Sequence, residues 1–363
     1  MSHRDDPAEQ GAATSVADRE TESNPGSRAA PESPIPSAAT RSEVQPRRFR
    51  TRAIVARFVG IGAFYVIVFA FFAAKSPDFL SGGNLADILA SAAPLGMVAI
   101  GQTAVIVGGG FDLSVGGVAP LGAVLFQVFD AHTGNLGLSV VGTAVCGAAF
   151  GLASGVIIAY LKINPLIATL GMLSVTGGIA YIITNGLTMT LPANGGFWAE
   201  NAFFGIQYGV IGMLALAAIV WILMRFSRLG RSIYAVGGNY EAARLAGIRC
   251  NLVTVSIYVL SGLCAALAGS VLASQLFAAA PNLGTSTSLD SVTAVVLGGA
   301  SLAGGVGGVW GTLLGVLLLG TISDGLGVLQ ISSYYQTIIS GAVLLVAVGF
   351  ARFRSVLLGG RFR

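Results

Sequence analysis

The sequence contains little charge. Only 10% of its 363 residues are Asp, Glu, Lys or Arg, whereas 54% are hydrophobic. A soluble domain carries about a quarter of its residues as charges. The first 57 residues hold 9 of the 20 Lys and Arg and 8 of the 16 Asp and Glu, so the rest of the chain is poorer still. That remainder is therefore predicted to be embedded in a membrane, which excludes a soluble enzyme and a nucleic-acid-binding protein.

Cysteine and histidine are also scarce. Three cysteines, an odd number with two inside apolar runs, argue against a disulfide framework. His3 and His132 are isolated from other ligand-type residues, so we predict no metal site. The chain has no GxxxxGK(S/T) motif, and its glycine run at 304–311 lacks the flanking strand and acidic residue of a dinucleotide site. We therefore expect no cofactor and no catalytic residue, and any ATP must be bound by another subunit.

Long apolar runs dominate the chain after residue 52. A helix needs about 20 apolar residues to cross about 30 Å of hydrocarbon. Ten such runs predict an all-α membrane bundle with spans near 56–74, 85–107, 115–131, 137–160, 165–185, 207–224, 252–273, 289–303, 306–324 and 333–351. The third and eighth are short and interrupted by Gly or by Pro120, so they are candidates for broken or re-entrant helices.

The composition divides the chain into three parts. Residues 1–52 are rich in Pro, Ser, Ala, Glu and Arg and are predicted to form a disordered cytoplasmic tail. Its terminal arginines act either as a topological anchor or as a lipid-binding segment. Residues 53–351 form the transmembrane domain, and 352–363 a basic cytoplasmic C-terminus. Ten of the eleven Lys and Arg after residue 57 then lie on one side, which places both termini in the cytoplasm.

The loop 225–251 carries the clearest local signals. Asn239 suits an N-cap, Glu241 the first turn, Arg244 the last turn and Gly247 the C′ position, so residues 239–247 are predicted to form a two-turn helix. Such a short helix is unstable alone in water. It is therefore either a docking element or a solvated turn.

Polar residues within or at the ends of the apolar spans form the second group of candidates, because each is costly in lipid unless it is paired or faces water. Asp112 or Ser114 could cap the third helix or contact a substrate. The frequent glycines predict closely packed helices that could slide or hinge. The candidates for the translocation path or for helix breaks are Gln102, Asp112, Ser114, Asn164, Thr169, Asn185, Asp290 and Gln336.

Four segments, in order, resemble one family. They are GQTAVIVGGGFDLSVG at 101–116, NPLIATLG at 164–171, GRSIYAVGGNYEAARLAGI at 230–248 and LDSVTAVVLGGASLAGG at 289–305, and the similarity continues through SYYQ at 333–336. Together they resemble permease subunits of ribose-type monosaccharide ABC importers. The resemblance covers about 58–351.

The resemblance implies a type II ABC importer-like fold and a homodimer in the bacterial cytoplasmic membrane. It also implies a separate cytoplasmic ATPase and an extracytoplasmic sugar-binding protein. The family's coupling loop corresponds here to Gly237, Asn239, Glu241, Ala242, Ala243, Arg244 and Gly247. The chain departs from the family pattern at four positions that bear on substrate identity, namely Gly177, Val306, Asp324 and Ser340.

Two functions follow from these observations. The first is the permease of an ATP-driven importer of a neutral monosaccharide such as ribose, xylose or galactose. The second is a self-sufficient secondary transporter or channel for a small polar solute, which would couple through Asp112 and Asp290. A docking helix at 239–247 favours the first, because a self-sufficient transporter does not need it.

Overall fold

A computed structural model describes residues 47–203 and 205–332, together with separate helical positions between 334 and 349. Seven helices of this described part are long and apolar enough to cross a membrane: α2 (Gly82–Val107), α3 (Val115–Thr133), α4 (Leu136–Tyr160), α5 (Pro165–Thr184), α6 (Tyr208–Phe226), α9 (Cys250–Leu276) and α11 (Val309–Val328). Shorter apolar helical stretches lie in α1 (Arg47–Lys75) and in α10 (Thr287–Leu297). The all-α bundle predicted from hydropathy is confirmed.

Two boundaries differ from the predicted ones. The first helix begins at Arg47, so the last six residues assigned to the tail are helical. Extending a helix that already exists requires no new nucleation, and arginine is a good helix former. The eighth span is shorter than expected, because α10 ends at Leu297 and the chain continues in turns to Gly308. Residues 1–46 and 351–363 lie outside the described residues, as does most of the tenth predicted span.

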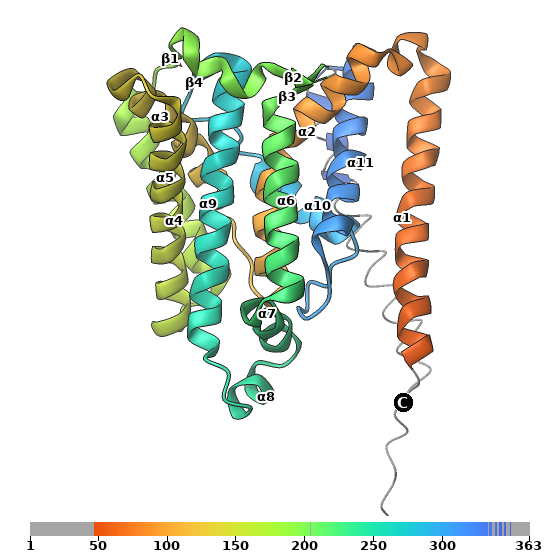
Figure 1. Cartoon of the computed structure of the whole chain (residues 1–363), viewed down its shortest axis with the longest axis vertical. Helices are drawn as coiled ribbons and strands as arrows, with labels where there is room; N and C mark the ends of the chain where they lie inside the picture. The colour runs from red at the N-terminus through yellow and green to blue at the C-terminus, as the bar shows by residue number, and fades with distance from the viewer. Residues whose placement is uncertain are drawn as a thin grey trace, which may run out of the picture. The chain divides into compact units, whose positions relative to one another are not determined.

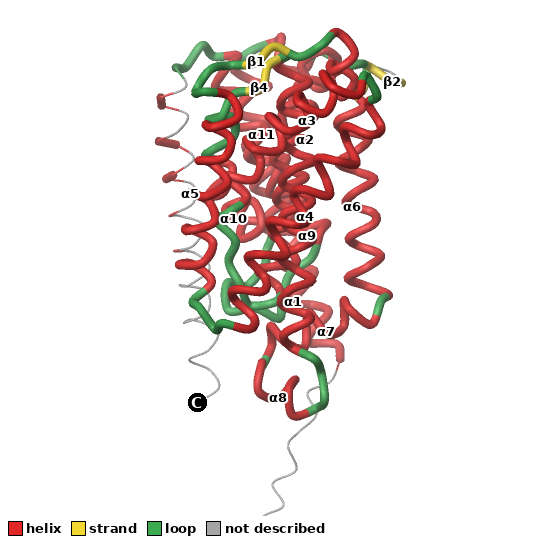
Figure 2. Tube along the Cα trace, turned by 90° about the vertical axis from the view of Figure 1, so that its left-hand side faces the viewer, coloured by secondary structure: helices red, strands yellow, loops and turns green. Residues whose placement is uncertain are grey.

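The ends of the long helices carry different small elements (Figures 1 and 2). At one end, which we call the α8 end, lie α7 (Arg228–Gly238) and α8 (Tyr240–Leu245). The opposite end, the strand end, holds the 3₁₀ segments and short strands. These are η1 (Pro77–Leu80), η2 (Ala193–Ala199), β1 (Met189–Thr190), β2 (Asn201–Phe203), β3 (Ile206–Gln207) and β4 (Ala278–Ala279). β1 pairs antiparallel with β4, with Met189 opposite Ala279, and β2 pairs antiparallel with β3.

Glycines bring the helices into close contact around α9, which packs against α2, α3 and α4. A Cβ added at Gly262 of α9 would overlap the carbonyl oxygen of Gly147 in α4, and one at Gly151 would overlap the carbonyl oxygen of Tyr258. Close backbone approach of this kind is what small residues permit in membrane bundles. The glycine-based packing predicted from composition is confirmed for these contacts.

The chain is non-helical at two places next to the spans predicted to be broken. Residues 108–114 separate α2 from α3, and residues 277–286 separate α9 from α10. α3 itself continues through Pro120 without a break. The Ser288 hydroxyl at the start of α10 donates to the Leu113 carbonyl at 2.9 Å, so the two interruptions meet inside the bundle.

Candidate functional site

The helix α8 has the capping that the sequence predicts. The Asn239 side chain accepts a hydrogen bond from the Ala242 backbone N–H at 3.0 Å, and Glu241 lies in the first turn. At the other end Gly247 has φ +81°, a conformation that favours glycine. The Gly247 N–H donates to Arg244 O and the Ile248 N–H to Ala243 O, which together form a Schellman motif. Both ends of this six-residue helix are therefore fixed by local hydrogen bonds.

One face of α8 is presented to the surroundings. The Arg244 guanidinium donates to Glu241 Oε2 at 2.8 and 3.0 Å, and these side chains are 62% and 66% exposed. Leu245 is 81% exposed, whereas Ala243 is buried against the bundle. An exposed ion pair contributes little to folding stability. The outer face is therefore available for contact with another molecule.

A polar network holds α8 against two other elements. Lys162, in the turn between α4 and α5, donates to the Tyr240 hydroxyl at 3.2 Å and to Asn251 Oδ1 at 2.9 Å. The Tyr240 hydroxyl also donates to Asn251 Oδ1, at 3.2 Å. A cavity of about 440 Å³ beside this network is lined by Gly108, Lys162, Asn164, Tyr240 and Tyr258, among others. The network links α8 to the beginning of α9.

The neighbouring helix α7 rests directly on the end of α2. A Cβ at Gly237 would overlap the Val107 carbonyl oxygen, and the Gly305 N–H donates to the same oxygen at 2.8 Å. The Tyr234 hydroxyl donates to Gly307 O at 2.9 Å. A displacement of α7 would therefore act on both the end of α2 and the loop that precedes α11.

Inside the bundle, a polar cluster surrounds the interruption before α3. Asp112 Oδ1 accepts hydrogen bonds from the Ser114 N–H, at 3.0 Å, and from its hydroxyl. The buried Tyr258 hydroxyl donates to Phe111 O at 2.9 Å. Ser114 is the N-cap residue of α3, but its side chain makes no capping bond. The Asp112 carboxylate thus fixes the turn that leads into the helix.

The structure separates the other residues predicted for the path. Gln102 is fully buried, and no hydrogen-bond partner for its amide is found among the described residues. Thr169 is buried and donates to Pro165 O of its own helix, and Asp290 is half-buried in the first turn of α10. Asn164 and Asn185 are exposed and cap opposite ends of α5. Gln336 lies outside the described residues.

Comparison with known proteins bears on what these elements do. The family model described as "Branched-chain amino acid transport system / permease component" matches residues 84–348. The ribose import permease protein RbsC of Escherichia coli (strain K12) is 40% identical over 322 residues, which cover 85% of this chain and 98% of the relative. The chain belongs to this permease family.

Other relatives of the permease agree with this assignment. RbsC of Bacillus subtilis is 39% identical over 82% of this chain and 92% of its own length. The L-arabinose ABC transporter permease protein AraH of Azospirillum brasilense is 34% identical, over 81% of this chain and 87% of its own. No solved structure matches the chain significantly. The chain is thus the membrane component of an ABC importer and not itself the ATPase.

Sequence reasoning missed several parts of the permease's site. It did not predict α7, although the apolar residues Leu229, Ile233 and Val236 follow helical spacing. It also missed the network of Lys162 with Tyr240 and Asn251, because these residues lie 78 and 89 positions from Lys162 in sequence. No local pattern signals a contact of that separation.

Proposed function

We propose that the permease carries a neutral monosaccharide across the membrane, driven by a separate ATPase. The observation that carries this proposal is the agreement among relatives, which are named as permeases for ribose, L-arabinose, D-allose and xylose at 32–40% identity. The family description names branched-chain amino acids instead. The sugar permeases match 80–85% of the chain, so they are the better guide to the substrate.

The charges of the bundle support a neutral substrate. All Lys and Arg side chains that the structure describes are exposed: Lys75, Lys162, Arg225, Arg228, Arg231, Arg244 and Arg249. Binding an anionic substrate inside the bundle would need such a cation. The interior instead offers uncharged groups, such as the Gln102 amide and the Thr103–Thr312 hydroxyl pair at 2.6 Å. These groups match the hydroxyls of a sugar.

We assign the outer face of α8 to the ATPase. The Glu241–Arg244 pair and Leu245 are exposed on a helix whose ends are fixed, as a rigid docking element requires. Motion of α8 and α7 would reach the end of α2, where the interruption at 108–114 begins, and the loop at 298–308 through the contacts of Gly237. An extracytoplasmic binding protein would deliver the sugar at the strand end.

The proposed assembly is a homodimer with the α8 end and both termini in the cytoplasm. The outer surface of α5 supports pairing of two copies, because Gly171, Ser174 and Gly178 are exposed at helical spacing. No atom of the described residues lies within 4 Å of a Cβ added at either glycine. A row of small residues lets two membrane helices approach closely.

Uptake in cells that carry the whole transport system tests the substrate. We expect transport of one or more neutral pentoses or hexoses from a panel that also contains nucleosides, phosphorylated sugars and branched-chain amino acids. Deleting the permease gene should abolish this uptake. Transport of amino acids or charged solutes, with no sugar transported, would contradict the proposal.

A further inference from the structure

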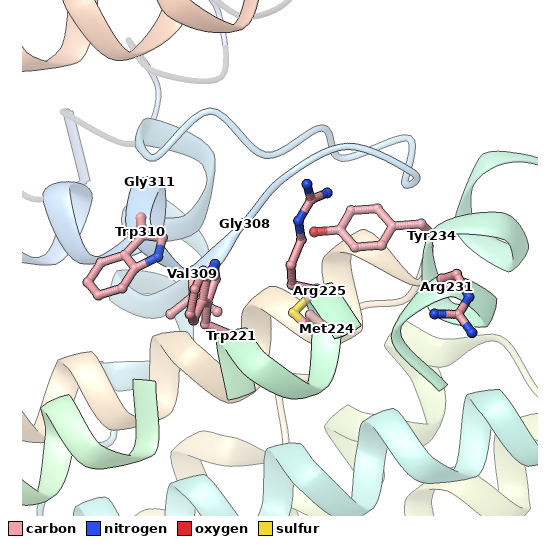
Figure 3. Close-up of a pocket in the computed structure, with 9 residues that line it drawn as sticks. All are labelled: Trp221, Met224, Arg225, Arg231, Tyr234, Gly308, Val309, Trp310 and Gly311. Atoms are coloured by element: carbon pink, nitrogen blue, oxygen red, sulfur yellow. The ribbon is translucent and has the colours of Figure 1, made fainter. Parts of the chain in front are cut away.

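A second cavity lies at the α8 end, between the end of α6 and the beginning of α11 (Figure 3). Its volume is about 340 Å³. Both helices are candidate membrane spans, and the cavity opens where they end, so it lies at the level of the membrane boundary. It is lined by Trp221, Met224, Arg225, Arg231, Tyr234, Gly308, Val309, Trp310 and Gly311.

Two tryptophans form one wall of this cavity. The rings of Trp221 and Trp310 are 6.0 Å apart in an edge-on arrangement, and Trp310 is 50% exposed. Trp221 lies near the end of α6, and Trp310 lies in the first turn of α11. Tryptophan is enriched at this depth, because its ring packs on lipid while its N–H reaches the polar headgroups.

The opposite wall is cationic. Arg225 and Arg231 are exposed, and no acidic residue occurs between Glu200 and Glu241 in the sequence. Among the described residues, the Arg225 guanidinium has no hydrogen bond or salt bridge, and the Arg231 guanidinium donates only to the Phe226 carbonyl, at 3.2 Å. Figure 3 shows the Arg225 guanidinium beside the Tyr234 phenol. Burial raises the pKa of Tyr234, and the Arg225 charge opposes that rise.

An apolar strip extends from the cavity along the outside of α6. Ile219, Ile222 and Phe226 follow helical spacing and are 61%, 52% and 63% exposed. The Phe226 ring contacts Trp221 edge-on, with 5.6 Å between the ring centroids. The strip therefore continues the tryptophan wall into the hydrocarbon region.

We propose that this cavity binds an anionic phospholipid. The phosphate would lie between Arg225 and Arg231, the glycerol region beside Trp310, and an acyl chain along Ile219 and Ile222. Basic pockets between membrane helices are suited to acidic lipid headgroups. Because the cavity contacts α6, α7 and the start of α11, a bound lipid would brace α7 against α11. The proposal depends on membrane insertion and not on which solute is transported.

Quenching of tryptophan fluorescence by brominated lipid tests the site directly. The chain has three tryptophans, so Trp198→Phe leaves Trp221 and Trp310 as the reporters. The full-length protein is reconstituted in phosphatidylcholine with a small fraction of brominated phosphatidylglycerol or brominated phosphatidylcholine. We expect about fivefold stronger quenching per mole of the anionic lipid, roughly the effect of one basic residue at an anionic membrane surface.

Charge variants distinguish lipid binding in this cavity from a general attraction of anionic lipid to the positively charged protein. Arg225→Gln with Arg231→Gln should bring the quenching down to the phosphatidylcholine level, and the corresponding pair of lysine variants should retain most of it. Arg228→Gln is the matched control, because Arg228 is exposed in α7, the helix that also holds Arg231, but does not line the cavity. Native gel-filtration behaviour and unchanged sugar-dependent uptake of the control confirm that the protein is folded.

Three results would overturn the proposal. Equal quenching by both brominated lipids would mean that the cavity does not select acidic headgroups. An equal loss in Arg228→Gln would mean that net charge, not the cavity, attracts the lipid. Unchanged quenching in the Arg225 and Arg231 glutamine variant, with loss of ATPase co-purification, would assign the arginines to a protein contact.

Discussion

Single glycines determine how closely α7 approaches the rest of the bundle. Gly237 and Gly238 are adjacent in α7, yet their surroundings differ. A Cβ at Gly237 would overlap the Val107 carbonyl oxygen, whereas in the part of the chain that the structure describes no atom lies within 4 Å of one at Gly238. The Val107 carbonyl cannot easily move away from Gly237, because it also accepts a hydrogen bond from the Gly305 N–H at 2.8 Å. The contact therefore has no room for a methyl group.

Gly237→Ala should lower both stability and transport. Overpacking a tight contact costs about 1–3 kcal/mol, and here the displaced atoms belong to the backbone. We expect a lower melting temperature of the purified permease and reduced uptake. Gly238→Ala is the matched control and should be close to wild type in both measurements. Equal behaviour of the two variants would show that α7 does not rest on Val107 in the working transporter.

The short helix α8 combines fixed ends with an outward-facing charge pair. Its N-cap, C′ glycine and two charged positions follow a local code, which explains why they could be predicted from sequence. The way in which α8 is held could not be predicted, because Lys162 lies 78 positions away from Tyr240 in the sequence. Because the Glu241 and Arg244 side chains are exposed, the function of α8 can be tested without disturbing the core.

Glu241→Ala or Arg244→Ala should uncouple transport from ATP hydrolysis. Both side chains are more than 60% exposed, so folding stability should change by no more than about 0.5 kcal/mol. We expect normal membrane insertion, loss of sugar uptake and weaker co-purification of the ATPase. Glu200→Ala, an exposed acidic residue near the strand end, should retain the ATPase. If both α8 variants transport normally and keep the ATPase, the segment is only a turn.

The described bundle shows what hydropathy can and cannot predict. The predicted spans coincide with long apolar helices wherever the described chain forms one, because length and composition alone identify such a helix. The short α10 and the interruption at 108–114 depend on contacts between distant segments, such as Ser288 with Leu113. Asn164 and Asn185, which cap the two ends of α5, are for the same reason predicted together with the buried polar residues. Hydropathy does not distinguish a cap such as Asn164 from a buried group such as Gln102.

Orientation and assembly are predicted together, and single cysteines can test both. In a background with Cys146, Cys250 and Cys264 replaced by alanine, we place one cysteine at Leu187, Ala242 or Ser174. Leu187 is 69% exposed near the strand end, and Ala242 is exposed on α8. An impermeant maleimide should label Leu187→Cys in intact cells and Ala242→Cys only after permeabilisation, since the basic residues cluster at the α8 end.

The Ser174→Cys variant reports on the dimer. Gly171 and Gly178 flank this position on the exposed face of α5, so two copies packed there would bring the two cysteines close enough to form a disulfide under mild oxidation. Ile219→Cys, 61% exposed on α6, is the control and should remain monomeric. A reversed labelling pattern would invert the bundle in the membrane. Cross-linking at position 219 but not at 174 would move the dimer interface from α5 to α6, where it would also compete with the proposed lipid.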